Sequence, residues 1–361
     1  MPKPLVDVTI AVHSESRPIA RAVASVVDHT AAAVRVNVVA HNIDPEIIRA
    51  NLGSYAEHPS VRLLSLADDI HSPAGPMNLG LASSDAAFVS VMGSDDELAP
   101  GAIDSWLALQ RETGASTVIA RILLGARGTD PYPPVRRGRR QRRLSARKDR
   151  LSYRSAPLGL VSRDVFGELR FTEGLPSGED LAYSAALWFT GRRIAYDLTG
   201  PAYLVNDDAS DRVTSAPRPV WDDFAFLDAI EAQPWFPRLG RADRKALVVK
   251  ILRVHFFDAV LARTKAPGGI GAHRVDLLDV LTRLESIAPG VTSLLARADR
   301  SVLDELRSET PDDDAILHFI DARWNYRTAG AILPRNLLLA LHRQAPFRTL
   351  YAGLKATTAG R

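Results

Sequence analysis

Two pairs of adjacent carboxylates have the residue types and spacing to do chemistry. Asp95 and Asp96 follow an apolar run at residues 88–92. Glu179 and Asp180 open a segment with helical periodicity. A carboxylate pair at a strand end can hold a divalent cation, because Mg²⁺ and Mn²⁺ prefer oxygen ligands and phosphates. A carboxylate at the start of a helix can act as a general base.

Each pair also has a purely structural interpretation. Gly, Ser and Asp all favour turns, so the acids after residue 92 would also suit a turn before a helix that starts near Pro100. Ser177 and Asp180 have the spacing of a helix capping box, and acids are favoured in a first helical turn. The two pairs alone do not decide between these interpretations, so the rest of the chain must.

The elements that would position these acids alternate along the first part of the chain. Apolar, β-rich runs predict strands, with helical segments between them, at 6–12, 34–40, 61–66, 86–92 and 116–124. This alternation predicts an α/β fold with a mostly parallel sheet and helices on both faces. From about residue 219 onward the pattern is helical. We therefore expect two domains, 1–217 and an all-α 218–361.

Composition limits the chemistry further. The 361 residues are 46% hydrophobic, enough for one large domain or two ordinary ones. The absence of cysteine excludes disulfides and thiolate metal sites. No signal peptide and no long apolar run is present, so we expect a cytoplasmic protein. Neither a dinucleotide-type glycine motif nor a Walker loop follows a strand, which disfavours those nucleotide folds.

The formal net charge of +3 is unevenly distributed. A basic loop at 136–150 and an acid-free tail at 322–361 both predict an anionic partner. The loop would either bind an anionic acceptor or be a solvated segment. The Leu-rich tail would lie peripherally on the inner face of the cell membrane, or pack on the catalytic domain or a second subunit. Nucleic acid is disfavoured, because no aromatics are interleaved with the basic residues.

The order of these features resembles family 2 glycosyltransferases of the GT-A fold over roughly residues 5–215. The resemblance rests on the loop 13–18, on "NLG", and on the segments "SDDELAPGAID", "GLPSGEDLAYSAALWFTGRRIAYD" and "YLVNDDASDRVT". It implies a bacterial, inverting enzyme that moves a sugar from a nucleotide-diphosphate sugar, most often a UDP-sugar. The implied acceptor is a hydroxyl of a cell-envelope glycan, glycolipid or wall polymer, and the implied cofactor is Mn²⁺ or Mg²⁺.

The resemblance also implies roles for individual residues. Asp95 would contact the metal, with Asp207 as a second metal-side acid. Asp180 would be the general base, and Glu179 would position it. The implied nucleotide-sugar contacts are Val12, His13, Ser14, Glu15, Arg17, Asn42, Asp44, Asn78, Ser94, Asp95 and Asp96.

Three positions depart from the family pattern, and all lie on the donor side. Gly93 stands where the metal motif has its first acid, and His41-Asn42 where an acid pair usually ends the second strand. Met77 replaces a basic residue. Two other functions therefore remain open. One is a non-catalytic scaffold that binds carbohydrate or a protein partner; the other is a nucleotidyltransferase, which would not need the second acidic pair.

Overall fold

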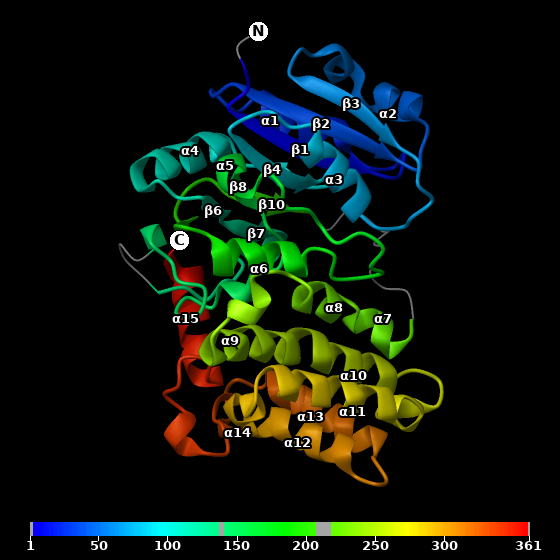
Figure 1. The fold of residues 1–361 in the computed structure, drawn as a ribbon, viewed down its shortest axis with the longest axis vertical. Coiled ribbons are helices and arrows are strands. Elements are labelled where there is room, and N and C mark those ends of the chain that lie inside the picture. The colour runs from blue at the N-terminus through cyan, green and yellow to red at the C-terminus, as the bar shows by residue number, and fades with distance from the viewer. Residues whose placement is uncertain (1–2, 137–140, 207–217, 360–361) are drawn as a thin grey trace.

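The structure, a computed structural model, describes residues 3–136, 141–206 and 218–359. A seven-stranded sheet in the order β3-β2-β1-β4-β8-β6-β9 forms its first half (Figure 1). All neighbours pair in parallel except β8, which runs antiparallel to β4 and β6. The mostly parallel sheet is confirmed. Its strands are β1 (Val6–Val12), β2 (Val34–His41), β3 (Val61–Leu66), β4 (Phe88–Gly93), β6 (Thr117–Ala120), β8 (Gly159–Ser162) and β9 (Ile194–Asp197).

Helices cover both faces of this sheet, as its near-continuous apolar strands require. One apolar cluster joins the strands to α1, α2 and α4, and another joins them to α3, α5 and α6. The alternation of strands and helices along the chain therefore reports the architecture correctly. These helices are α1 (Ile19–Val27), α2 (Pro45–Leu52), α3 (Ala74–Ala82), α4 (Ala102–Thr113), α5 (Arg163–Phe166) and α6 (Leu181–Thr190).

A small three-stranded sheet lies beside the large one and brings distant segments together. It consists of β5 (Glu97–Leu98), β10 (Tyr203–Val205) and β7 (Ile122–Leu124), in that order. The single strand expected at 116–124 is wrong, because it breaks at Arg121 and its two halves join different sheets. Pairing of β10 with β5 places the chain after residue 205 against the acids that follow β4.

The C-terminal region is helical, as predicted, and carries its own apolar cluster. Leu181 and Ala182 of α6 belong to that cluster, so α6 packs on both parts of the chain. The proposed boundary at 217 borders residues outside the described ranges and stays a prediction. The helices are α7 (Val220–Phe224), α8 (Phe226–Glu231), α9 (Arg241–Ile251), a π-helical turn (Leu252–Phe256), α10 (Phe257–Thr264), α11 (Gly269–Ile287), α12 (Arg297–Arg307), α13 (Asp313–Trp324), α14 (Ala329–Ile332) and α15 (Pro346–Ala359).

The last helix, α15, leaves the helical region and runs back along the sheet domain (Figure 1). Its Ala356 is buried in a cluster of sheet and α6 side chains, and Gly353 lies beside Pro131. Helix α15 of the tail thus packs on the sheet domain, one of the two expected arrangements. Within the described ranges, no helix is both long and apolar enough to cross a membrane.

Asp7 is a fully buried acid inside the apolar strand β1. Its carboxylate accepts hydrogen bonds from Nε and Nη2 of Arg35 at 2.7 and 2.8 Å. It also accepts from the backbone N–H groups of Asp85 and Ala86, both at 3.0 Å. The carboxylate therefore ties β1 to β2 and to the chain entering β4. This fixes the pairing that places Gly93 opposite Ala11 at the sheet edge.

Asp7→Ala should lower the free energy of unfolding by about 3 kcal/mol, because two buried N–H groups and Arg35 lose their acceptor. Urea denaturation measures this change. Asp85→Ala is the matched control, since it removes the exposed second partner of the same Arg35 and should stay near wild type. Equal losses in the two variants would show that Asp7 is not the anchor.

Candidate active site

The acid loop, residues 94–97, follows β4 at the carboxyl edge of the sheet, where ligands of open α/β sheets bind. Oδ2 of Asp95 lies 2.8 Å from Nη1 of the buried Arg17. Arg21 donates to the backbone carbonyl of Asp95 at 2.6 Å and pairs with Glu97 at 3.2 Å. Two guanidinium groups from the start of α1 therefore face the acid loop. Arg21 was not predicted, although it lies four residues after Arg17.

The departure at Gly93 has a steric cause. A Cβ at this position would lie 2.6 Å from Oδ2 of Asp96 and 3.1 Å from Oδ1 of Asp95. The Tyr203 hydroxyl donates to Oδ2 of Asp96 at 2.6 Å and accepts from the Gly93 N–H at 2.9 Å. The two carboxylates thus fold over residue 93, so any side chain there would require the Asp96 carboxylate, which Tyr203 holds, to shift.

The segment after β10 completes the acid loop. Asn206 donates from its backbone to Asp96 at 3.2 Å, and from its side chain to the Asp95 carbonyl and to Glu97, both at 3.0 Å. This segment was expected on the metal side, and Asn206 does reach the acid loop. Asp207, the predicted second metal ligand, lies outside the described residues.

The donor set fits a cation that substrate phosphates help to hold. Among the described residues, no group of three or more His, Asp or Glu side chains is arranged as a metal site. Both oxygens of Asp96 accept hydrogen bonds, from Tyr203 and Asn206, and Oδ2 of Asp95 pairs with Arg17, so substrate phosphates would have to supply much of a cation's coordination. Mg²⁺ is commonly held by one or two carboxylates together with substrate phosphates.

Asp68, which sequence reasoning missed, supplies an acid next to His41-Asn42. Its Oδ1 lies 2.8 Å from Nε2 of His41 and accepts from Nδ2 of Asn42 at 3.2 Å. Asn42 in turn accepts from the N–H groups of Asp68 and Asp69 at 3.0 and 3.1 Å. Partial burial raises the pKa of Asp68. The hydrogen bonds from Ile70, His41 and Asn42 lower it by a larger amount, so the pKa of Asp68 lies below its usual value. The "DD" after the third strand was the available signal.

The loop after β1 lies beside the acid loop through Arg17. Val12 is buried at the end of β1, and His13 and Glu15 are exposed. The Ser14 hydroxyl bonds to that of Ser16 at 2.8 Å, and the Glu15 carbonyl accepts from Asn51 at 2.8 Å. These contacts shape the loop and place His13 and Glu15 toward solvent.

Of three other predicted donor contacts, Asp44 and Asn78 have structural partners and Ser94 is buried. Asp44 is exposed and caps α2 by accepting from the Glu46 N–H at 2.9 Å. Ser94 is buried at the start of the acid loop. The buried Asn78 accepts from the Phe171 N–H at 2.8 Å and donates to the Phe171 carbonyl and to Glu173 at 3.0 and 2.8 Å. Asn78 therefore links α3 to the segment that leads to Glu179 and Asp180.

Glu179 and Asp180 lie half-buried at the start of α6. Asp180 is the N-cap residue, but no side chain among the described residues caps this helix, so the capping-box interpretation is wrong. Burial, together with the charge of Asp180, raises the pKa of Glu179 to about 7. Burial also raises the pKa of Asp180, against the opposing influence of the Lys250 charge. Perturbed acids of this kind are typical of functional sites.

Lys250 of α9 is a fully buried cation near Asp180, and the sequence did not reveal it. Its Nζ donates to the Ser155 hydroxyl at 2.7 Å and lies 2.6 Å from Nε2 of His255. The π-helical turn explains this contact, because residues five apart share a face in a π-helix and not in an α-helix. Burial lowers the pKa of Lys250 to about 8. Burial and the Lys250 charge lower the pKa of His255 well below its usual value, so the imidazole is neutral and accepts.

Comparison of the sequence with protein families identifies a matching family. Residues 7–170 match the model of glycosyl transferase family 2. This chain carries a family 2 glycosyltransferase domain. No curated protein sequence matches it.

Solved structures similar to this glycosyltransferase include S. aureus TarS. TarS residues 1–349 in complex with UDP-GlcNAc share 15% identity, with 88% of this chain and 90% of that chain covered and a TM-score of 0.68. The complex with UDP gives the same identity and coverage and a TM-score of 0.67. A longer TarS structure is 16% identical over 88% of this chain and 55% of its own, with a TM-score of 0.68. At this identity the likeness establishes the GT-A fold, including the helical C-terminal region.

Glu179→Gln should stabilise this glycosyltransferase at pH 8 and much less at pH 5. A raised pKa means that the native state binds the Glu179 proton more tightly than the unfolded chain between the usual pKa of 4.5 and about 7. Stability is therefore lost as pH rises through that window, by roughly 3 kcal/mol, and Gln avoids this loss.

Denaturant unfolding of both proteins at the two pH values measures the difference. Glu57→Gln, which changes a side chain that is 87% exposed, is the control and should show no pH-dependent gain. A Glu179→Gln effect of equal size at pH 5 and pH 8 would contradict the raised pKa.

Proposed function

We propose that this glycosyltransferase moves a sugar, with inversion, from a UDP-sugar to a hydroxyl of an anionic cell-envelope glycan, glycolipid or wall polymer. The observation that carries the proposal is the Glu179-Asp180 pair. It lies uncapped at the start of α6, with raised pKa values and with the buried Lys250 close by. A scaffold without activity has no use for such a costly group of buried charges. A nucleotidyltransferase does not need it either.

Asp180 is the proposed general base. In a single displacement, Asp180 takes the proton of the acceptor hydroxyl while that oxygen attacks the anomeric carbon and the nucleoside diphosphate leaves from the opposite face. The charge of Lys250 favours the ionised form of Asp180. Glu179, protonated below about pH 7, keeps a second negative charge away from the base.

The donor side has groups suited to each part of a nucleoside diphosphate. The guanidinium groups of Arg17 and Arg21 suit the diphosphate, which guanidinium binds well. Asp68 and Asn42 suit hydrogen bonds to a base or ribose. Asp95 would hold Mn²⁺ or Mg²⁺ together with the diphosphate, and the cation would stabilise the charge on that leaving group. The TarS complexes contain UDP-GlcNAc and UDP, which makes uridine the first nucleotide to test.

The basic loop contributes less free charge to an acceptor than its composition indicates. Arg136 binds Asp149 through two hydrogen bonds of 2.6 and 2.7 Å, and Arg142 binds Glu112 at 2.6 Å. Arg150 is buried and donates to backbone carbonyls. Arg137, Arg139 and Arg140 lie outside the described residues. An acceptor role for this loop stays a prediction.

Replacing Asp95 should affect donor binding, whereas replacing Asp180 should affect turnover, so the two variants separate these steps. Asp95→Asn should weaken UDP binding in the presence of Mn²⁺ by tenfold or more. Asp180→Asn should leave UDP binding intact and lower hydrolysis of UDP-GlcNAc by about 10²–10⁴-fold, the usual contribution of a general base. Isothermal titration with UDP, GDP, CDP and ADP, with and without Mn²⁺, measures the first quantity, and release of UDP measures the second.

Because the protein offers few carboxylates to a metal, Mn²⁺ should bind weakly without nucleotide and tightly with it. No binding of any nucleotide to folded protein would refute the donor site. Turnover that survives in Asp180→Asn would refute the assigned base while leaving the donor site standing.

Lys250→Met should move the acid limb of the pH–rate profile to higher pH. Removing the cation deprives ionised Asp180 of its stabilising neighbour, so the pKa of the base rises further. Rates of UDP-GlcNAc hydrolysis between pH 5 and 9 test this, with the exposed Lys265→Met as the control. A profile that falls uniformly, without a shift, would mean that Lys250 acts on packing alone.

A further inference from the structure

The leucine segment, residues 337–341, exposes large apolar side chains. Leu337, Leu338 and Leu341 are 57%, 90% and 71% exposed. In α15, Phe347, Tyr351 and Leu354 continue the pattern, at 42%, 51% and 57% exposed. Their spacing of four and three residues places them on one helix face, while Gly353 and Ala356 pack against the sheet domain.

This concentration is unusual for the molecule. Of the large hydrophobic side chains exposed among the described residues, half lie between 337 and 354. Exposed apolar side chains that gather in one stretch of chain are candidates for contact with a membrane or another molecule. The chain from residue 322 onward contains no acid, so whatever covers this surface must tolerate or favour positive charge.

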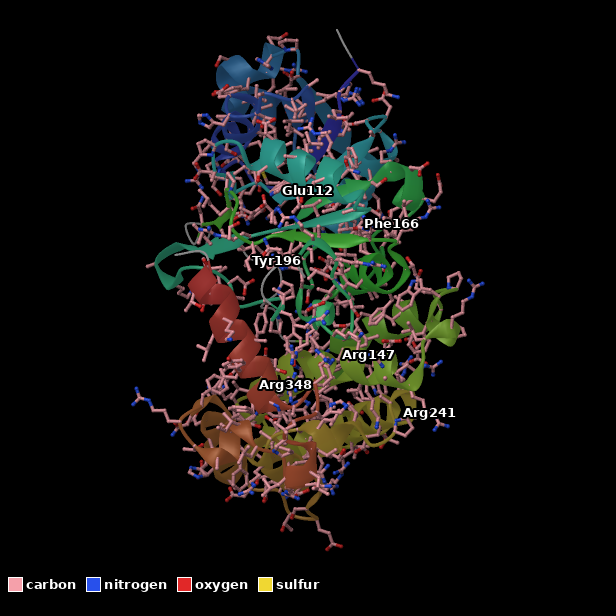
Figure 2. All side chains as sticks on the ribbon, turned by 90° about the vertical axis from the view of Figure 1, so that its left-hand side faces the viewer. Glu112, Arg147, Phe166, Tyr196, Arg241 and Arg348 are labelled. Atoms are coloured by element: carbon pink, nitrogen blue, oxygen red, sulfur yellow. The ribbon has the colours of Figure 1, made fainter. Side chains whose placement is uncertain are left out.

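A basic groove adjoins the leucine segment. It has a volume of about 740 Å³, and its lining includes Arg147, Lys148, Arg241, Lys245, His342 and Arg343. His342 and Arg343 follow Leu341 directly, so the groove and the exposed leucines share one stretch of chain. Figure 2 shows Arg147, Arg241 and Arg348 on the side of the molecule where α15 lies.

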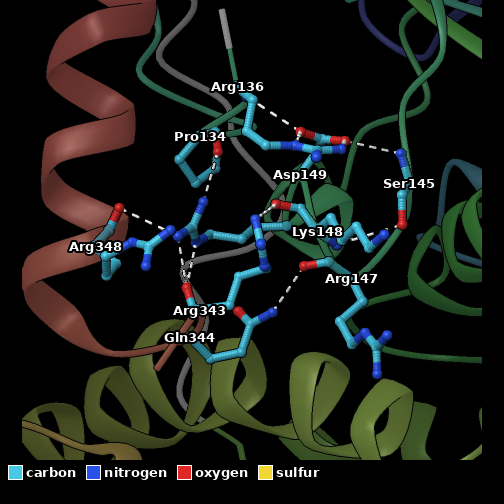
Figure 3. A network of polar contacts seen from close by, with 10 residues as sticks. Pro134, Arg136, Ser145, Arg147, Lys148, Asp149, Arg343, Gln344 and Arg348 are labelled. Carbon is cyan, nitrogen blue, oxygen red and sulfur yellow. Dashed lines mark hydrogen bonds and ion pairs between the residues drawn. The ribbon is translucent and has the colours of Figure 1, made fainter. Parts of the chain in front are cut away.

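A network of backbone contacts forms the groove without consuming its charges. Arg150 is buried and donates to the carbonyls of Pro134, Arg343 and Arg348 at 3.1, 2.5 and 3.2 Å (Figure 3). Gln344 donates to the Arg147 carbonyl at 2.9 Å. These bonds fasten the basic loop to the C-terminal segment and leave the side chains of Arg147 and Lys148 at the groove.

Few of the positive charges that line the basic groove are paired with carboxylates. Arg147 has Asp243 only at 3.8 Å, and Asp149 is bound by Arg136. Burial, followed by the charges of Lys245, Arg147 and Arg343, lowers the pKa of His342. Burial and the charges of Arg136 and Arg348 likewise lower the pKa of Arg343. The groove therefore has a positive potential that a bound anion would relieve.

We propose that the leucine segment and the basic groove together form a docking surface for an anionic lipid bilayer. The exposed leucines would enter the boundary between head groups and acyl chains, and the groove cations would bind lipid phosphates. A second copy of the chain fits the surface less well. A two-fold contact would bring two mainly cationic surfaces together, and such like-charge contacts are unfavourable.

The groove and Lys250 lie toward opposite ends of α9. Arg241 and Lys245 line the groove from the first half of α9, whereas Lys250 lies near its other end. At 1.5 Å per residue, Arg241 and Lys250 are roughly 13 Å apart along the helix axis. The docking surface and the catalytic acids are thus separate, and the proposal does not depend on the identity of the sugar donor.

Sedimentation of the full chain with phosphatidylcholine vesicles, with and without phosphatidylglycerol, tests the proposal. We expect binding that requires phosphatidylglycerol and weakens at high salt. Leu338→Ser combined with Leu341→Ser, and Arg147→Ser combined with Lys245→Ser, should each reduce the vesicle affinity about tenfold or more, since each basic residue near the surface contributes about 1 kcal/mol. All replaced side chains are exposed or half-buried, so the variants should fold.

Val275→Ser and Arg111→Ser are the matched controls. Val275 is 66% exposed on α11, and Arg111 is exposed on α4, away from the surface. Both should bind vesicles like wild type. Failure to sediment with phosphatidylglycerol at low salt would overturn the proposal, as would binding that the leucine variant leaves unchanged. A dimer in sedimentation velocity that the leucine variant dissociates would instead assign the surface to a second copy.

Discussion

The buried ammonium group of Lys250, from the helical region, lies near the Asp180 carboxylate of the sheet domain. The proposed acceptor site depends on this charge pairing. Lys250 belongs to the helical region, whereas Asp180 starts a helix that packs on the sheet. Ser155 and His255 bind the ammonium group from either side. Neither half of the chain contains the complete charge arrangement, so the two must fold against each other before the site exists. The shared apolar cluster around Leu181 supplies the packing for this contact.

The carboxylates on the proposed donor side also have cations beside them, but these cations come from a different part of the chain. Here the cations come from the loop before α1 and from α1 itself, with Arg17 on the Asp95 carboxylate and Arg21 on its carbonyl. Tyr203 and Asn206 hold Asp96 from the far end of the sheet domain. The missing first acid therefore reflects a compact loop in which carboxylates cover residue 93.

The sequence predicted the features that depend on local pattern. Alternating apolar runs located β1 to β4, and the two acid pairs marked both halves of the candidate site. Features that depend on distant contacts were beyond it. The break at Arg121 arises because two sheets compete for one strand, and the antiparallel β8 has no pattern that distinguishes it from a parallel neighbour.

The same contrast, between local sequence patterns and contacts with distant segments, applies to individual side chains. Asp68 and Lys250 gain their positions from segments far away in sequence, so no local motif reveals them. Asn78 and Asp44 were predicted to contact the donor, yet in this structure Asn78 binds Phe171 and Glu173, and Asp44 caps α2. Arg150 of the basic loop likewise binds the backbone carbonyls of Pro134 and Arg348, which the composition of the loop does not reveal.

The π-helical turn at Leu252–Phe256 carries one residue more per turn than a straight α-helix would. The extra residue changes which faces of α9 and α10 align, because one residue rotates the following helix by roughly 100° about the helix axis. Shortening the chain there by a single residue would turn His255 away from Lys250, or else turn the whole following apolar face of α10 out of its core. The length of this helix, and not only its composition, is thus under constraint from both of its ends.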